Sequence, residues 1–221
     1  MSAEPGREAD VEQRAALLLQ LRRAGVRDVA IMRAIERAPR LLFAPHRFRD
    51  LADRDLSLPI GCGQSMPSAA DLGRRIEALA VSSHHRVLEV GAGSGYAAAV
   101  LAQLAREIVS LERFASLAAE ASARLESAGV TNARVIHADG LAPPEELGAF
   151  ERIMLHVAVR EPPEALIARL APGGIMLFGR AAQGKTRGIR LERLAEAGGF
   201  KETDLGPCRL PLALSGLAAR L

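Results

Sequence analysis

Hydrophobic positions recur with a helical period over the first 80 residues of the chain. The recurring residues form three stripes: Leu17, Leu18 and Leu21; Val29, Met32 and Ile35; and Leu72, Ile76 and Leu79. These stripes predict helices, with breaks at Ala24-Gly25 and before Pro39. The segment Leu51–Met66 contains Pro59, Gly61 and Gly63, so we expect a loop there.

From Arg86 onward the pattern changes to short apolar runs that alternate with helical stretches. The runs predict strands at 86–90, 108–111, 133–138, 152–157 and 175–178. Helices are expected at 96–104, at 114–128 with Gly129 just beyond its end, and from Pro162-Pro163 through Leu170. Strands that alternate with helices favour an α/β fold with a Rossmann-like, doubly wound and mostly parallel sheet, preceded by an N-terminal helical extension.

The C-terminal region is less regular than the rest of this pattern. Gly184 and Gly188 predict a loop around Lys185–Arg187, and Ile189–Leu194 is compatible with a strand or a helix. We expect one or two antiparallel strands added at one edge of the sheet. The chain then divides into an N-terminal helical and loop segment, residues 1–80, and a Rossmann-like core, residues 81–221, packed as one compact unit.

Composition narrows the class of protein. The 221 residues are 49% hydrophobic and 25% charged with a net charge of +3, which is typical of a globular chain. Arginine dominates the basic residues, but a weak net charge with 3% aromatic residues argues against nucleic-acid binding. The polar N-terminus does not resemble a signal peptide, and no apolar run is long enough to span a membrane, so we expect a cytoplasmic protein. Cys62, Cys208 and the five histidines lack metal-ligand spacing, so no metal site is predicted.

A glycine motif stands at the junction of the strand 86–90 with the next helix. Gly91, Gly93 and Gly95 allow the backbone to turn sharply and approach a ligand closely, beside the free N–H groups of a helix N-terminus. Glu112 ends the following strand, 21 residues after Gly91, close to the spacing expected of a ribose-binding acid. This context favours a nucleotide-type ligand over a purely structural turn.

Three acidic residues lie at the ends of successive predicted strands: Glu89, Glu112 and Asp139, the last followed by Gly140. Glu89 precedes the first glycine by two residues, where an acid repels a pyrophosphate but suits a ligand with cationic groups. The glycine spacing also differs from the dinucleotide pattern. The motif therefore predicts S-adenosylmethionine, which carries a sulfonium and an amino group, with Glu112 on the ribose and Asp139 on the adenine. An NAD oxidoreductase is the weaker interpretation.

Several segments together resemble the protein-L-isoaspartate O-methyltransferase family, whose members are class I methyltransferases. The resemblance rests on the cofactor motif Arg86–Tyr96 and, more specifically, on the upstream segments Pro39–Pro45 and Leu58–Ser65. It extends through Leu170–Gly174 and Arg209–Leu212, and so runs from about Leu17 almost to the C-terminus. It implies methyl transfer to a carboxylate, with a peptide or protein carrying an L-isoaspartyl residue as the substrate.

The substrate half departs from the family pattern. Pro67 stands where the family has the serine assigned to catalysis, and proline has neither a hydroxyl nor an N–H group. Ser65 matches the threonine of the family and Ser68 follows one position late, so these two are the candidate catalytic residues. Glu151 replaces an aspartate, and a segment beginning with His156 replaces small residues.

Three interpretations remain at this point. The first is an S-adenosylmethionine-dependent methyltransferase that acts on a carboxylate such as that of an isoaspartyl residue. The second is a divergent enzyme with another acceptor, in which His156 is either a general base or a histidine without chemistry. The third is a cofactor-binding protein that no longer transfers methyl groups. The sequence does not give the oligomeric state.

Overall fold

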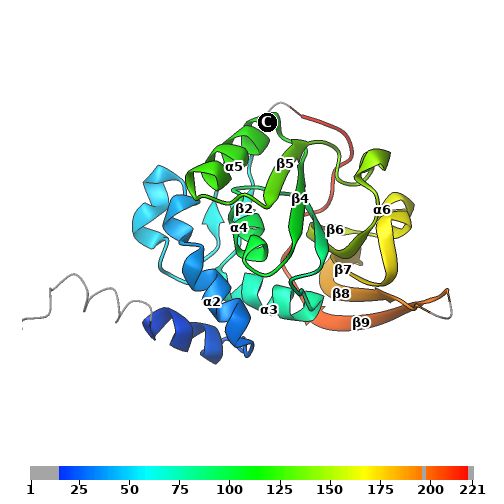
Figure 1. The fold of residues 1–221 in the computed structure, drawn as a ribbon, viewed down its shortest axis with the longest axis horizontal. Coiled ribbons are helices and arrows are strands. Elements are labelled where there is room, and N and C mark those ends of the chain that lie inside the picture. The colour runs from blue at the N-terminus through cyan, green and yellow to red at the C-terminus, as the bar shows by residue number, and fades with distance from the viewer. Residues whose placement is uncertain (1–14, 196–197, 219–221) are drawn as a thin grey trace, which may run out of the picture.

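A computed structural model describes residues 15–195 and 198–218 of the chain (Figure 1). A helix over residues 15–23 begins the described part. The longer helices that follow are α2 (Val29–Arg37), α3 (Ala69–Leu79), α4 (Tyr96–Ala102), α5 (Ala115–Ser127) and α6 (Glu164–Arg169). Short 3-10 helices are η1 (Arg40–Leu42), η2 (His46–Leu51) and η3 (Glu145–Leu147). Asp28 caps α2 and Ser68 caps α3, each by accepting backbone N–H groups of the first turn.

One seven-stranded sheet forms the centre of the fold in the order β5-β4-β3-β6-β7-β8-β9. Its strands are β3 (Arg86–Val90), β4 (Glu107–Glu112), β5 (Ala133–His137), β6 (Phe150–Val159), β7 (Leu170–Ala182), β8 (Lys185–Arg193) and β9 (Phe200–Pro207). Strands β3 to β7 are parallel, whereas β8 and β9 pair antiparallel. This order confirms the Rossmann-like prediction, including the antiparallel strands at one edge.

Alternate residues of the strands enter two hydrophobic clusters on opposite faces of the sheet. Val87 and Ile108 belong to a cluster with residues of α2, α3, α4 and α5, and Leu88 and Val109 belong to a cluster that includes Leu166 of α6. Because strand side chains alternate between faces, this arrangement gives a three-layer fold (Figure 1). The N-terminal helices share the first cluster with the sheet.

Two local predictions were wrong. The segment Leu51–Met66 is not only a loop, because β1 (Leu58–Pro59) and β2 (Ser65–Met66) pair antiparallel within it. The predicted loop at Lys185–Arg187 is the beginning of β8. The chain turns one step earlier at Gln183 and Gly184, both of which have positive φ angles, so the hairpin is tighter than expected. Ile189–Leu194 lies mostly in β8 and is therefore not helical.

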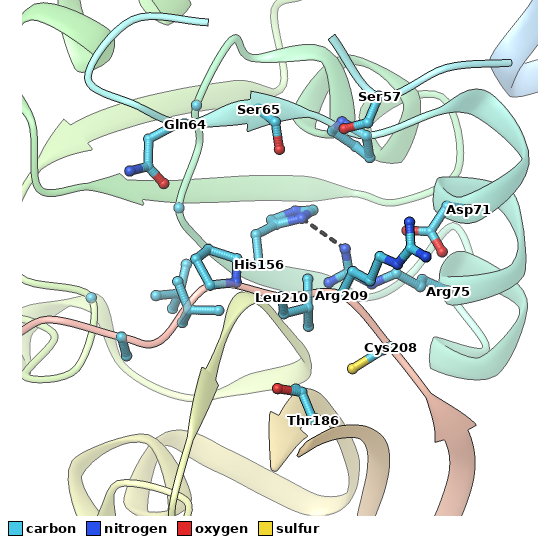
Figure 2. A pocket seen from close by; sticks show the side chains of 18 of the residues that line it. Ser57, Gln64, Ser65, Asp71, Arg75, His156, Thr186, Cys208, Arg209 and Leu210 are labelled. Atoms are coloured by element: carbon cyan, nitrogen blue, oxygen red, sulfur yellow. Dashed lines mark hydrogen bonds between the residues drawn. The ribbon is translucent and has the colours of Figure 1, made fainter. Parts of the chain in front are cut away.

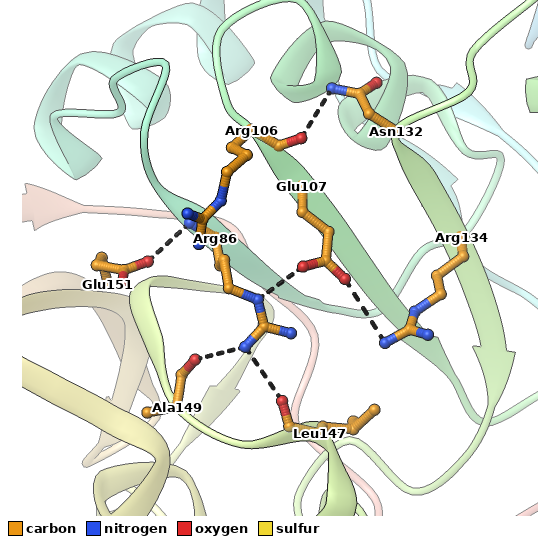
Figure 3. A network of polar contacts seen from close by, with 8 residues as sticks. All are labelled: Arg86, Arg106, Glu107, Asn132, Arg134, Leu147, Ala149 and Glu151. Carbon is orange, nitrogen blue, oxygen red and sulfur yellow. Dashed lines mark hydrogen bonds and ion pairs between the residues drawn. The ribbon is translucent and has the colours of Figure 1, made fainter.

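Polar groups join the strands at the amino ends of the sheet (Figure 3). Arg86 donates from Nε to Glu107 at 2.6 Å and from Nη1 to the carbonyl oxygen of Ala149 at 2.9 Å. The hydrogen bond from Arg86 holds the pKa of Glu107 below its ordinary value. Glu151 accepts the backbone N–H group of Arg86 at 2.7 Å. Glu151 therefore helps to join the strands at the amino end of the sheet, opposite the carboxyl ends of β3 and β4.

Candidate functional site

A cavity of about 870 Å³ opens at the carboxyl ends of the central strands. Its walls include Gly91 after β3, Glu112 at the end of β4, Asp139 after β5 and His156 in β6. The chain crosses from one side of the sheet to the other between β3 and β6, and open α/β sheets bind ligands at such a switch point. The volume is in the range of small-molecule sites.

The three glycines of the motif adopt conformations that other residues rarely take. Their φ angles are +91° at Gly91, +56° at Gly93 and +86° at Gly95. A Cβ atom at Gly93 would also lie 3.2 Å from Ile60 Cδ1, and one at Gly95 would lie 3.2 Å from the carbonyl oxygen of Ala121. The loop therefore requires glycine for its shape, and Gly91 and Gly93 line the cavity.

Glu112 is fixed against this loop. Its Oε2 atom accepts the N–H group of Gly93 at 2.9 Å and its Oε1 atom accepts that of Phe114 at 3.0 Å. The residue is only 4% exposed but lines the cavity. Each carboxylate oxygen has a second acceptor position, so Glu112 retains the capacity to bind the two hydroxyls of a ribose.

Asp139 is tied to the C-terminal segment, residues 207–218, which runs beside the carboxyl ends of the strands (red in Figure 1). The Oδ2 atom of Asp139 accepts the N–H group of Gly216 at 2.6 Å, and its Oδ1 atom accepts that of Leu141 at 2.9 Å. Asp139 and Gly140 both line the cavity. A Cβ atom at Gly140 would overlap the side chain of Val90, so only glycine lets the chain pass so close to β3.

Glu89, which the sequence predicts to bind the cofactor, differs from Glu112 and Asp139 in its surroundings. Its side chain is fully buried beneath the cavity, and Glu89 is not among the described residues that line it. One carboxylate oxygen accepts the Ser110 hydroxyl, and the other lies 2.9 Å from His156 Nε2. A buried carboxylate requires such partners. Glu89 therefore acts on the site through His156, which does line the cavity.

His156 connects Glu89 to Arg75 of α3 (Figure 2). Its Nδ1 atom lies 3.0 Å from Arg75 Nη1, and Arg75 Nη2 donates to the carbonyl oxygen of Leu155 at 2.7 Å. A guanidinium only donates hydrogen bonds, so Nδ1 of His156 is the acceptor and Nε2 carries the proton donated to Glu89. The imidazole ring is thus held from both sides. Burial lowers the pKa of Arg75 from its ordinary value.

The candidate serines line the same cavity from the segment before α3. The Ser65 side chain lies across the cavity from Arg75 and His156 (Figure 2). Ser68 Oγ accepts the N–H group of Asp71 at 3.2 Å and caps α3. Pro67 also lines the cavity, and its carbonyl oxygen accepts a hydrogen bond from Arg40 at 2.9 Å.

Sequence reasoning missed part of this wall. Arg75 carries no motif, and residues 207–211 of the C-terminal segment line the cavity although their sequence gives no signal beyond the resemblance at Arg209–Leu212. Cys208 lies beside Arg75 in Figure 2, and burial raises the pKa of its thiol, so it is protonated at neutral pH.

Within residues 15–195 and 198–218 no group of three metal-ligating side chains occurs, and no helix is long and apolar enough to cross a membrane.

The sequence model of the family described as protein-L-isoaspartate(D-aspartate) O-methyltransferase matches residues 12–198 of the chain. A protein-L-isoaspartate O-methyltransferase of Azorhizobium caulinodans is 38% identical over 214 residues, which cover 97% of this chain and 98% of that protein. An enzyme of the same name from Rhodopseudomonas palustris strain BisA53 is 42% identical over 203 residues, covering 92% of this chain and 94% of the relative.

Solved structures share the fold at low sequence identity. A protein-L-isoaspartate O-methyltransferase matches with a TM-score of 0.80 at 22% identity, over 92% of this chain and 67% of that chain. A protein from Plasmodium falciparum, described as a putative protein-L-isoaspartate O-methyltransferase in complex with S-adenosyl-L-homocysteine, matches with a TM-score of 0.76 at 20% identity, over 93% and 98% of the two chains. These two structures support the architecture of the sheet.

Proposed function

Because the chain belongs to the protein-L-isoaspartate (D-aspartate) O-methyltransferase family, we propose that it transfers a methyl group from S-adenosylmethionine to the free carboxylate of an L-isoaspartyl residue in a damaged protein. The full-length likeness to relatives of that name carries the proposal. The cytoplasmic location that the sequence predicts is part of this proposal.

The residues at the carboxyl ends of β3 to β5 fit the cofactor. Gly93 keeps the loop open to the cavity, Glu112 presents a buried carboxylate with free acceptor positions, and Asp139 adds a second acid after β5. Two acids on this side suit a ligand with cationic groups. When bound, S-adenosylmethionine supplies an electrophilic methyl group on a sulfonium, and its transfer to a carboxylate oxygen gives a methyl ester and a neutral thioether without moving a proton.

The residues of this chain then have to bind the acceptor, orient its carboxylate toward the methyl group and exclude water from the cavity. A carboxylate is ionised at neutral pH, so the acceptor needs no general base. Rate enhancement depends on alignment of the reacting groups in a cavity shielded from water. The C-terminal segment supports this shielding, because backbone hydrogen bonds at Ala158 and Arg113 and a bond from the Gly216 N–H group to the Asp139 carboxylate hold it beside the strand ends.

A peptide assay tests the proposed function. The purified protein is incubated with methyl-labelled S-adenosylmethionine and either an isoaspartyl peptide or its normal aspartyl twin. We expect label to enter the isoaspartyl peptide and the twin to remain unlabelled. Cofactor binding without transfer to either peptide would contradict the proposal and favour a protein that has lost the activity. Label in both peptides would contradict the isoaspartyl specificity.

Replacing the two candidate serines is expected to have different effects, one on catalysis and one on stability. Ser65→Ala removes a hydroxyl that faces the cavity, so we expect kcat/KM for the isoaspartyl peptide to fall by about 3- to 10-fold, the contribution of one ordinary hydrogen bond. Ser68→Ala removes the cap of α3 and is expected to lower the free energy of unfolding by about 1 kcal/mol. Steady-state kinetics and urea denaturation measure the two effects. An unchanged kcat/KM in Ser65→Ala would remove that residue from the site.

A further inference from the structure

Arg75 is a cation without an acidic partner in the cavity wall. Its guanidinium donates to two neutral acceptors, His156 Nδ1 and the Leu155 carbonyl oxygen. In the part of the chain that the structure describes, no carboxylate forms an ion pair with Arg75 within 4.0 Å. Asp71, which also lines the cavity, pairs with Arg74 and acts on Arg75 only at longer range. A guanidinium has five N–H groups, so Arg75 retains donors beyond these two bonds. A partly buried cation with spare donors favours an anionic ligand.

The charges around the cavity are divided across the sheet. Glu112 ends β4 and Asp139 follows β5, on one side of β3. Arg113 also lines the cavity on this side, and its Nε donates to the carbonyl oxygen of Gly216. The basic end of the cavity, defined as Arg75, Lys185, Arg187 and Arg209, belongs to α3, to β8 and to the C-terminal segment on the other side. Arg187 pairs with Asp204. Two acids also line this wall: Asp55 accepts the N–H group of Ala70, and Asp71 pairs with Arg74. The acidic side suits the cationic cofactor, and the basic end suits a carboxylate.

Hydrogen bonds to neighbouring groups fix the position of the Arg75 guanidinium. His156 Nδ1 (Figure 2) and the Leu155 carbonyl oxygen orient the guanidinium, and Glu89 holds His156 from its other ring nitrogen. A preorganised planar fork binds a carboxylate with less loss of side-chain entropy than a free arginine. The family resemblance implies that Pro67 occupies the position of the family's serine, and Pro67, which lines the cavity, supplies no hydroxyl donor.

We propose that Arg75 binds the free carboxylate of the acceptor residue, with His156 and Glu89 as its positioning residues. The inference rests on the proposed function and assigns its acceptor site. The carboxylate loses its negative charge as it becomes an ester, so the attraction to Arg75 is strongest before the reaction. Loss of Arg75 therefore raises KM while kcat is retained, and it removes the discrimination between the charged substrate and a neutral analogue.

Kinetics of Arg75→Met test this assignment. We expect KM for the isoaspartyl peptide to rise by about 10- to 100-fold, as for the loss of a charge-assisted hydrogen bond, with kcat within about threefold of the wild type. Arg75→Lys keeps the positive charge but lacks the planar guanidinium, so its KM should lie between those of the wild type and Arg75→Met. Arg33→Met is the matched control, because Arg33 is an exposed arginine of α2 and does not line the cavity. Unchanged KM in Arg75→Met, or a loss confined to kcat, would overturn the proposal.

A binding measurement separates this proposal from the proposed function. Calorimetry on the protein saturated with S-adenosylhomocysteine compares the isoaspartyl peptide with an analogue whose free carboxylate is an amide. The wild type should prefer the carboxylate by about 10-fold or more, and Arg75→Met should lose this preference. Binding with that preference but no turnover would contradict the proposed function alone. Turnover by the wild type with the same preference in Arg75→Met would contradict the assignment of Arg75 alone, and a wild type that neither binds nor methylates the peptide would overturn both. Arg75→Lys gives the comparison if Arg75→Met does not fold.

Discussion

Replacing Glu112 by alanine is expected to weaken the binding of S-adenosylhomocysteine by at least about 100-fold. Two hydrogen bonds from ribose hydroxyls to a carboxylate are together worth about 3–6 kcal/mol, and a 100-fold change in affinity corresponds to about 2.7 kcal/mol. The substitution also removes the acceptor of the Gly93 N–H group, so the glycine loop loses its support. Isothermal titration calorimetry with the purified variant measures the change directly.

Glu107 provides the matched control for this experiment. It lies at the other end of the same strand, β4, and pairs with Arg86 outside the cavity. Glu107→Ala should therefore bind S-adenosylhomocysteine like the wild type while it lowers stability. If Glu112→Ala bound the ligand as well as the wild type, the assignment of Glu112 to the ribose would be wrong. A comparable loss of affinity in both variants would indicate general destabilisation.

The architecture could be predicted because its determinants are local. The inner parallel strands contain short apolar runs because both of their faces are buried, and a helix follows each of β3, β4 and β6. Residues that follow such strands collect at one edge of the sheet, which is why Gly91, Glu112 and Asp139 were expected together and do line one cavity. The β hairpin at Gln183-Gly184 was misplaced because glycines on both sides offered two turn positions.

The remainder of the site depends on contacts between distant parts of the chain. Arg75 reaches His156 across 81 positions, and the Gly216 N–H group reaches Asp139 across 77. No periodicity or spacing rule encodes such pairs. Glu89 differs from Glu112 in its surroundings: it stands one residue before the end of β3, its side chain is bonded to Ser110 and His156, and it is not among the described residues that line the cavity. Strand-end position alone does not distinguish a lining acid from a buried one.

Arg40 holds the segment that forms one wall of the cavity. Its side chain is 7% exposed, and its guanidinium lies 5.5 Å from the centre of the Tyr96 ring. Four hydrogen bonds of 2.8–2.9 Å run from its two Nη atoms to backbone carbonyl oxygens. The acceptors are Ala52, Arg54, Leu56 and Pro67. One side chain thus joins both ends of the loop that carries Ser65.

Arg40→Met should therefore lower the free energy of unfolding by at least about 3 kcal/mol, because four carbonyl groups that are mostly shielded from water lose a charged donor together. Urea denaturation measures this, with Arg49→Met as the control, since Arg49 is exposed in the neighbouring η2 and its replacement should cost less than about 0.5 kcal/mol. In the fraction that remains folded, KM for the isoaspartyl peptide should rise more than the dissociation constant of S-adenosylhomocysteine, since the loop carries Ser65 and Pro67 and none of the cofactor acids. An Arg40→Met protein within about 1 kcal/mol of the wild type would show that β1, β2 and the packing of Met66 hold the loop without the guanidinium.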